Sequence, residues 1–133
     1  MTNIGFGDTM HVLHNTLNLR EEKQQVISSN IANADTPGFA PSRLNFEQEL
    51  KNSISDSNVT LVSSNPEHYP LHDGPPDVQG RVERFPSPTH IGDQNNVSVD
   101  QEMQKLAENQ IKYEAASKML KKKFSSLQYV IRK

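Results

Sequence analysis

Two histidines three residues apart, His11 and His14, come closest in this chain to side chains placed for chemistry. On a helix that spacing puts both imidazoles on one face, where they could bind a metal ion. No carboxylate completes the pair at a readable spacing, so we expect no metal and no cofactor. His68 and His72 fall in a proline-rich stretch, where solvated loop side chains are expected.

The other reactive residue types do not form a recognisable site either. Glu47 and Glu49 lie on a polar stretch, and nothing in the surrounding sequence would prepare either one for proton transfer. The chain has no cysteine, which excludes a thiolate metal site, a disulfide framework and a cysteine nucleophile. It also has no glycine-rich phosphate loop, nucleophile elbow or HExxH motif. We therefore expect that the protein is not an enzyme.

The two ends of the chain share a helical pattern. Residues 10–34 and 99–131 carry apolar side chains at alternating steps of three and four, and neither segment contains a proline. All eight prolines lie between Pro37 and Pro88. The expected fold is mainly α: long N- and C-terminal helices pair in a coiled-coil-like arrangement, with a largely irregular middle that holds at most a short β-hairpin.

Composition predicts that this one domain completes its core with neighbouring copies. The 133 residues are 33% hydrophobic, and the mean hydropathy is -0.73. We expect termini that are partly disordered in the monomer, which would then show less helix by circular dichroism than the two patterned ends imply. The predicted parts are residues 1–39, 40–97 and 98–133.

Charge and hydropathy exclude two classes of partner. Residues 35–97 carry four basic and nine acidic groups, whereas residues 98–133 carry eight basic and four acidic groups. The pI is about 6.2 and no aromatic residues are interleaved with the basic ones, so we expect no nucleic-acid partner. No apolar run approaches the roughly 18 residues of a membrane span, so we expect no direct membrane insertion.

The apolar positions of the two helical patterns form a predicted assembly seam. Two positions of the first pattern, Arg20 and Gln24, are polar, and we expect them to set the register or to face a polar partner. Asp8 or Thr9 would cap the start of the first helix, after a loose stretch at Gly5 and Gly7. The assembly seam consists of Leu13, Leu17, Ile27, Ile31, Met103, Leu106, Tyr113, Leu120, Phe124, Leu127 and Ile131.

A turn is predicted directly after the first helix. Asn33 would end the helix in the left-handed conformation, and Pro37-Gly38 suits the centre of a type II turn over residues 36–39. Phe39 would follow that turn as an apolar anchor.

Weaker patterns mark the middle and the start of the second helix. Ser98 and Gln101 predict a capping box. Two short strands are expected at residues 59–62 and 81–85. A short helix or an extended piece is expected to carry three apolar residues, Leu44, Phe46 and Leu50.

The string around this turn resembles a known signature. Residues 29–39 read Ser-Asn-Ile-Ala-Asn-Ala-Asp-Thr-Pro-Gly-Phe, which resembles the N-terminal motif of bacterial flagellar rod, hook and hook-associated axial proteins. Segments of residues 95–127, including Leu106-Ala107-Glu108-Asn109-Gln110 and Lys122-Lys123-Phe124, are similar to the short members that form the proximal rod. The signature positions are Asn30, Asn33, Asp35, Thr36, Pro37, Gly38 and Phe39.

The resemblance implies a structural subunit of the flagellar basal body. Such proteins leave the cytoplasm through the flagellar type III export apparatus without cleavage and polymerise in the periplasm into a hollow rod. This rod transmits torque and passes later subunits. The implied partners are further copies of the chain, the rod proteins FlgC, FlgF and FlgG, FliE, the export apparatus and the MS ring. Phe6 and Met10, four residues apart, could form an export signal.

Two alternatives remain from the sequence. A cytoplasmic helical adaptor or chaperone of flagellar export would also show paired amphipathic helices. Another short rod protein, such as FlgC, would share the N-terminal signature, although the C-terminal segments favour the proximal member.

Overall fold

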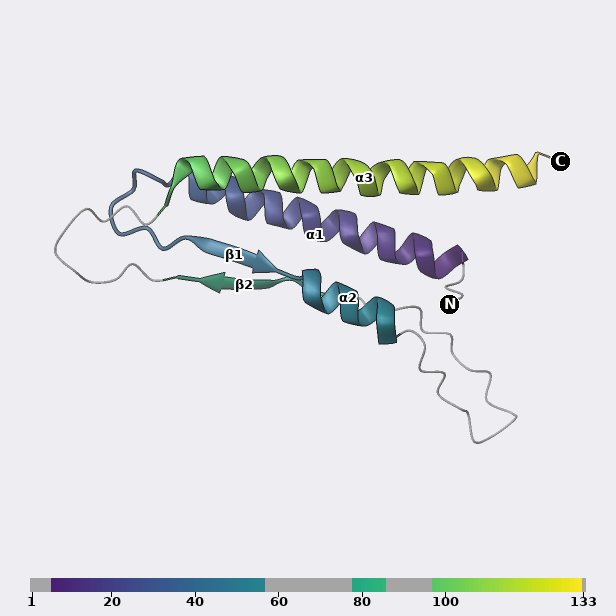
Figure 1. The fold of residues 1–133 in the computed structure, drawn as a ribbon, viewed down its shortest axis with the longest axis horizontal. Coiled ribbons are helices and arrows are strands. Elements are labelled where there is room, and N and C mark those ends of the chain that lie inside the picture. Colours follow the sequence, from purple (N-terminus) through teal and green to yellow (C-terminus); the bar gives the residue numbers. More distant parts are fainter. Residues whose placement is uncertain (1–5, 57–77, 86–96, 133) are drawn as a thin grey trace, which may run out of the picture.

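The computed structural model describes residues 6–56, 78–85 and 97–132, which form two long helices, one short helix and a two-stranded sheet (Figure 1). The two long helices are the first and the last elements in the sequence. In chain order the elements are α1 (Phe6–Ala32), β1 (Ser42–Asn45), α2 (Glu47–Asp56), β2 (Arg81–Arg84) and α3 (Val99–Ile131).

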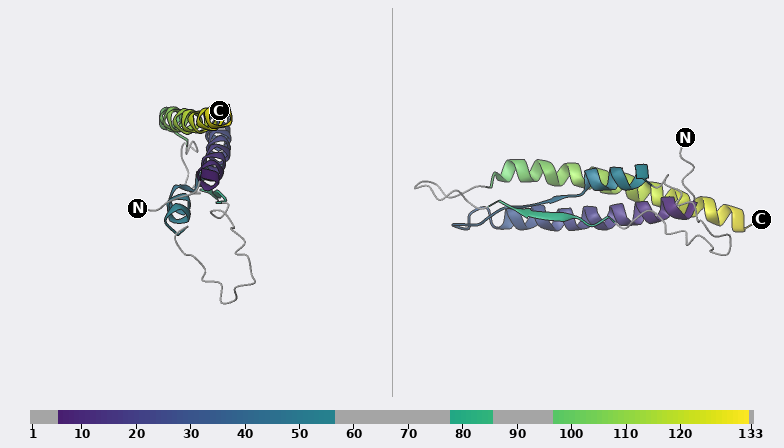
Figure 2. Two further views of the ribbon diagram at one scale, coloured as in Figure 1. Left: turned by 90° about the vertical axis from the view of Figure 1, so that its right-hand side faces the viewer. Right: turned by 90° about the horizontal axis from the view of Figure 1, so that it is seen from below.

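The two long helices lie side by side and run antiparallel, as Figures 1 and 2 show from three directions. Asn30 near the end of α1 bonds Glu102 near the start of α3. Phe6 at the start of α1 lies 5.3 Å from the Lys123 ammonium, measured to the ring centroid. The predicted helical architecture and the pairing of the terminal helices are therefore confirmed.

The first helix begins earlier than predicted. Phe6 is its first residue, so Gly7, which we expected in a loose stretch, is helical. A glycine costs a helix about 1 kcal/mol relative to alanine, a penalty that packing can outweigh. The contact of Phe6 with Lys123 shows that α3 supports this first turn.

The turn after α1 is confirmed, but the predicted helix end is wrong. Gly38 has φ 73°, and the Phe39 amide donates to the Thr36 carbonyl at 3.2 Å, as a type II turn requires. Asn33 is not left-handed, since no described residue other than glycine has a positive φ. Its side-chain amide instead donates to the Ser29 carbonyl at 2.8 Å, which closes the last turn without a left-handed residue.

A small apolar core lies beside α1 and not between the long helices. Strands β1 and β2 pair antiparallel with Leu44 opposite Val82, and β2 confirms the strand predicted near residues 81–85. The segment with Leu44, Phe46 and Leu50 was expected to be a short helix or an extended piece. Both forms occur, because β1 leads directly into α2. The predicted strand at residues 59–62 lies outside the described residues. The core cluster consists of Leu19, Leu44, Phe46 and Val78, with Val26 and Leu50 packed against it.

The predicted capping box at α3 is wrong, although Ser98 does lie at the start of the helix. Ser98 is the N-cap residue, with extended φ and ψ of -85° and 109°, but its side chain makes no capping hydrogen bond. Its carbonyl accepts the Glu102 amide at 3.0 Å. Asp100 and Glu102 place negative charge in the first turn, which stabilises the exposed amides there without a side-chain cap.

Candidate functional site

The face along which α1 and α3 meet is largely polar. The buried residues of α3 are Glu102, Asn109 and Ala116, which are seven residues apart and therefore lie along one line of the helix. The buried residues of α1 also include polar side chains. The buried residues of this helix are Asn15, Leu19, Arg20, Ile27 and Asn30. Pairing of the two helices within one chain therefore depends on specific polar contacts.

The predicted assembly seam overlaps this face only in part. Leu106, Leu120 and Leu127 are partly buried, whereas Met103 and Phe124 are about half exposed. Tyr113 and Ile131 are also exposed. On α1, Ile27 is buried, and the other three seam residues, Leu13, Leu17 and Ile31, are partly buried. A role of the seam in assembly stays a prediction.

Asn30, a signature residue, is bonded to two other elements. Its side-chain amide donates to the Ser42 carbonyl at 2.8 Å and to Glu102 Oε2 at 3.1 Å. Its Oδ1 accepts the Ser42 amide at 3.0 Å, and only 1% of the residue is exposed. Asn30 therefore joins α1 to the first residue of β1 and to α3, which was not predicted from sequence.

We predict that the Asn30→Ala variant is less stable by about 3 kcal/mol, because the partly buried Ser42 backbone groups and the buried Glu102 lose partners. Urea unfolding followed by circular dichroism measures this change. As a matched control, Asn18→Ala removes an exposed asparagine of α1 and should change stability by about 0.5 kcal/mol or less. An equal loss of stability in both variants would contradict the role of Asn30 in joining the three elements.

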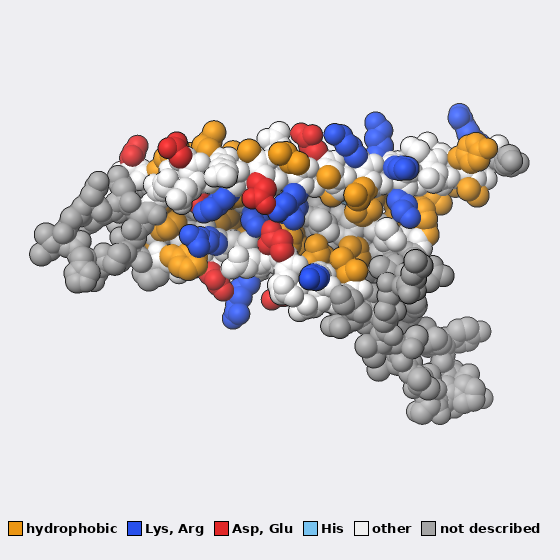
Figure 3. Space-filling model, viewed as in Figure 1, with side chains coloured by type: hydrophobic (Ala, Val, Ile, Leu, Met, Phe, Trp, Pro, Cys, Tyr) orange, Lys and Arg blue, Asp and Glu red, His pale blue; other side chains and the backbone are white. Residues whose placement is uncertain are grey.

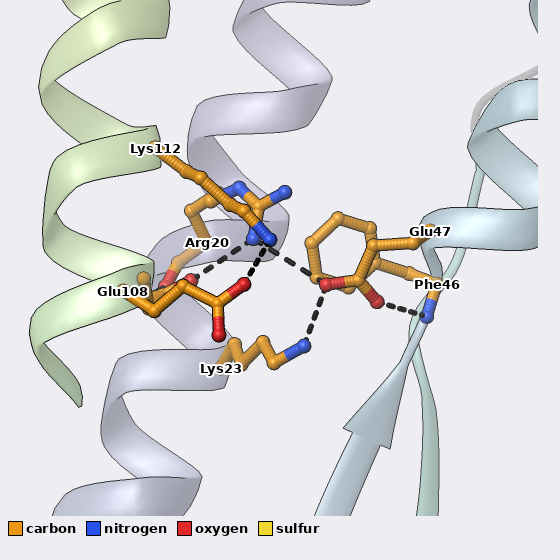
Figure 4. A network of polar contacts seen from close by, with 7 residues as sticks. Arg20, Lys23, Phe46, Glu47, Glu108 and Lys112 are labelled. Carbon is orange, nitrogen blue, oxygen red and sulfur yellow. Dashed lines mark hydrogen bonds and ion pairs between the residues drawn. The ribbon is translucent and has the colours of Figure 1, made fainter. Parts of the chain in front are cut away.

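Arg20 connects α1 to both α2 and α3 (Figure 4). Its Nη1 donates to Asn109 Oδ1 at 3.2 Å and to Glu47 Oε1 at 3.4 Å. Asn109 returns a bond from Nδ2 to the Arg20 carbonyl at 2.8 Å. The prediction that Arg20 faces a polar partner is thus confirmed, whereas Gln24 is exposed.

Phe46 and Glu47 dock the start of α2 onto α1. The Phe46 ring is 1% exposed and lies 5.0 Å from the Arg20 guanidinium and 5.4 Å from the Lys23 ammonium, measured to the ring centroid. Lys23 Nζ also donates to Glu47 Oε1 at 2.6 Å. Arg20 and Lys23 therefore both contact the Phe46 ring and the Glu47 carboxylate, which are two favourable partners for positive charge.

These contacts give Glu47 a pH-dependent role. Partial burial raises its pKa, but the hydrogen bond and the charge of Lys23 and backbone hydrogen bonds outweigh burial, so the pKa is lowered from 4.5. A carboxyl with a lowered folded-state pKa stabilises the fold above its unfolded pKa, and this stabilisation is lost as the pH falls through the folded pKa. We predict that acidification from pH 7 to below 4.5 destabilises the wild type more than Glu47→Gln, as measured by urea unfolding. Parallel pH profiles would contradict the prediction.

The remaining predicted residues lie on the surface or partly buried. Four of the signature residues, Asp35, Thr36, Pro37 and Gly38, are exposed, while Asn33 and Phe39 are partly buried. Phe6 is exposed and Met10 is partly buried.

The histidine pair of α1 has no third metal ligand beside it among the described residues. His11 and His14 are exposed, and the described residues contain no group of three side chains that could hold a metal ion. His68 and His72 lie outside the described residues. Among the described helices, none is long and apolar enough to cross a membrane.

Sequence reasoning missed Glu102 and Asn109 as contact residues. They lie one position before Met103 and Gln110 of the predicted pattern. Their seven-residue spacing, continued by Ala116, was a signal for a polar line on α3. Apolar residues alone were used to place the seam, so this line was not recognised.

Comparisons with known proteins agree on one family. The sequence profile described as "Flagella basal body rod protein" matches residues 10–39, which cover most of α1 and the turn. The chain is similar to the flagellar basal body rod protein FlgB of Aeromonas hydrophila, with 32% identity over 93% of this chain and 92% of the relative. FlgB of Bacillus subtilis strain 168 is 32% identical over 95% of each chain, and that of Escherichia coli K12 is 31% identical over 86% of each.

Proposed function

The chain belongs to the FlgB family of flagellar basal body rod proteins, and from this premise we propose that it polymerises in the periplasm as part of the proximal rod. Members of the family are structural subunits and not enzymes. The chain is accordingly a structural rod subunit of the flagellar basal body and assembles with other rod components. Its position within the rod, its route of export and its individual partners are parts of the proposal.

The observation that supports polymerisation is the apolar surface of α3. Figure 3 shows hydrophobic side chains along this helix on the face in view. Large apolar side chains exposed along one helix favour contact with neighbouring molecules, because their burial removes apolar surface from water. The exposed large hydrophobic residues of α3 are Val99, Met103, Ile111, Tyr113, Met119, Phe124, Tyr129, Val130 and Ile131.

The distribution of burial along α3 supports export before assembly. Ala116 is its last buried residue in the described chain, and after it only Leu120, Lys123 and Leu127 are partly buried. A helix without a packed face is marginal in water, and such a segment can pass a narrow channel unfolded. We infer that this part of α3 folds fully when neighbouring subunits cover it.

The proposed partners follow from the family premise. They are further copies of the chain, FlgC, FlgF, FlgG, FliE, the type III export apparatus and the MS ring. Phe6 and Met10 lie one helical turn apart at the start of α1, where an export apparatus could bind them before folding. An export assay tests this point, and secretion of Phe6→Ser at the wild-type level would contradict it.

Quantitative mass spectrometry of purified hook–basal bodies tests the proposed function. A rod subunit should be present at a level comparable to those of known rod proteins. The cytoplasmic adaptor instead predicts that the chain is absent from these particles and present in the cytosol. That second result would overturn the proposal.

A further inference from the structure

A groove of about 340 Å³ lies between α1, β1 and α3, on the face that carries the Arg20 network. Figure 3 shows charged side chains gathered in the middle of this face. All four β1 residues line the groove on one side. The basic residues that line it come from all three elements and are Arg20, Lys23, Arg43, Lys105 and Lys112.

The groove has more positive than negative charge. Its three carboxylates belong to Glu47, Glu102 and Glu108, and each is paired with a lysine that also lines the groove. The pairs are Glu47 with Lys23, Glu102 with Lys105, and Glu108 with Lys112. Arg20 also pairs with Glu47, so this carboxylate is shared by two cations. With five basic residues and three carboxylates, the groove lining has a net charge of +2.

The two arginines differ in how their charge is used. Arg20 is 8% exposed, and its buried Nε has no hydrogen-bond partner among the described residues. Its Nη1 bonds Glu47 and Asn109, so the Arg20 guanidinium is held by partners within the chain. Arg43 is exposed and lies 4.7 Å from the Phe85 ring centroid, a contact that leaves its hydrogen-bond donors available.

We propose that the groove binds the acidic segment of residues 57–77 from a second copy of the chain, with its carboxylates facing Arg43. This segment contains Glu67, Asp73 and Asp77 and no lysine or arginine, so its charge is complementary to that of the groove. The inference rests on the proposed function, because a polymer holds a second copy at a fixed position beside the first.

Cysteine cross-linking tests this contact, because the chain has no cysteine of its own. Cells that lack the native protein would co-express Arg43→Cys with either Glu67→Cys or Asp73→Cys. Hook–basal bodies are then purified, treated with a thiol cross-linker and run on a denaturing gel. We expect a cross-linked dimer from at least one pair. The matched control is Arg81→Cys, because Arg81 is an exposed arginine of β2 that does not line the groove.

The outcomes separate this proposal from the proposed function. A dimer yield with Arg43→Cys at least about tenfold above that with Arg81→Cys supports the groove contact, since proximity raises the effective concentration. Particles that contain both variants but give no such dimer overturn the contact. A cross-link formed only within one chain that carries both substitutions overturns the second copy as occupant. Absence of the chain from the particles overturns the proposed function itself.

Discussion

Rod assembly and swimming are expected to be lost when Leu127 or Leu120 is replaced by aspartate. Both residues belong to the predicted assembly seam, and both are already partly buried in the single chain. A neighbouring subunit that covers the exposed apolar surface of α3 would bury them further. An unpaired carboxylate at such a position is strongly unfavourable, because the assembled interface cannot hydrate the charge. Swimming in soft agar and electron microscopy of basal bodies measure the effect.

A matched control separates this effect from a general intolerance of negative charge. Ser125 lies on the same helix between the two leucines and is exposed, with its hydroxyl bonded to the Lys121 carbonyl. Ser125→Asp introduces the same charge away from the seam and should leave swimming intact. Normal swimming of Leu120→Asp and Leu127→Asp would contradict the seam. Loss of swimming in all three variants would show that α3 does not tolerate charge in general.

A loss of about 3–5 kcal/mol of unfolding free energy is expected for Phe46→Ala, as for other buried phenylalanines. The ring is fully buried at the point where β1 meets α2, and it belongs to the small core with Leu19 and Leu44. Its removal leaves a cavity and also removes the face against which Arg20 and Lys23 lie. Urea unfolding followed by circular dichroism measures the loss.

The control for this prediction is Phe85→Ala, which removes the same ring from the surface. Phe85 is 40% exposed, and its ring lies 4.7 Å from the Arg43 guanidinium, measured to the ring centroid. Its replacement should cost about 1 kcal/mol or less, the value of an exposed cation–π contact. If Phe46→Ala lost as little unfolding free energy as Phe85→Ala, the core would not depend on Phe46.

Local patterns predicted the elements well, because helices and turns form through contacts within a few residues. The three–four spacing of residues 10–34 and 99–131 predicted both long helices, and Pro37-Gly38 predicted the turn. The predicted left-handed Asn33 and the capping box at Ser98 were wrong, although both are also local features. Each of those helix ends has several ways to satisfy its backbone groups, and the sequence does not select among them.

By itself the sequence determined two proline-free helices, the turn after the first helix and the family signature, since each depends on local residue order. Only the tertiary structure decided which line of α3 faces α1. That line is set by Asn30 with Glu102 and by Arg20 with Asn109, pairs separated by 72 and 89 residues. A buried polar group needs a partner, and the partner's position depends on the whole fold. For this reason polar contacts fix the pairing within one chain, while much of the apolar surface of α3 remains exposed for other subunits.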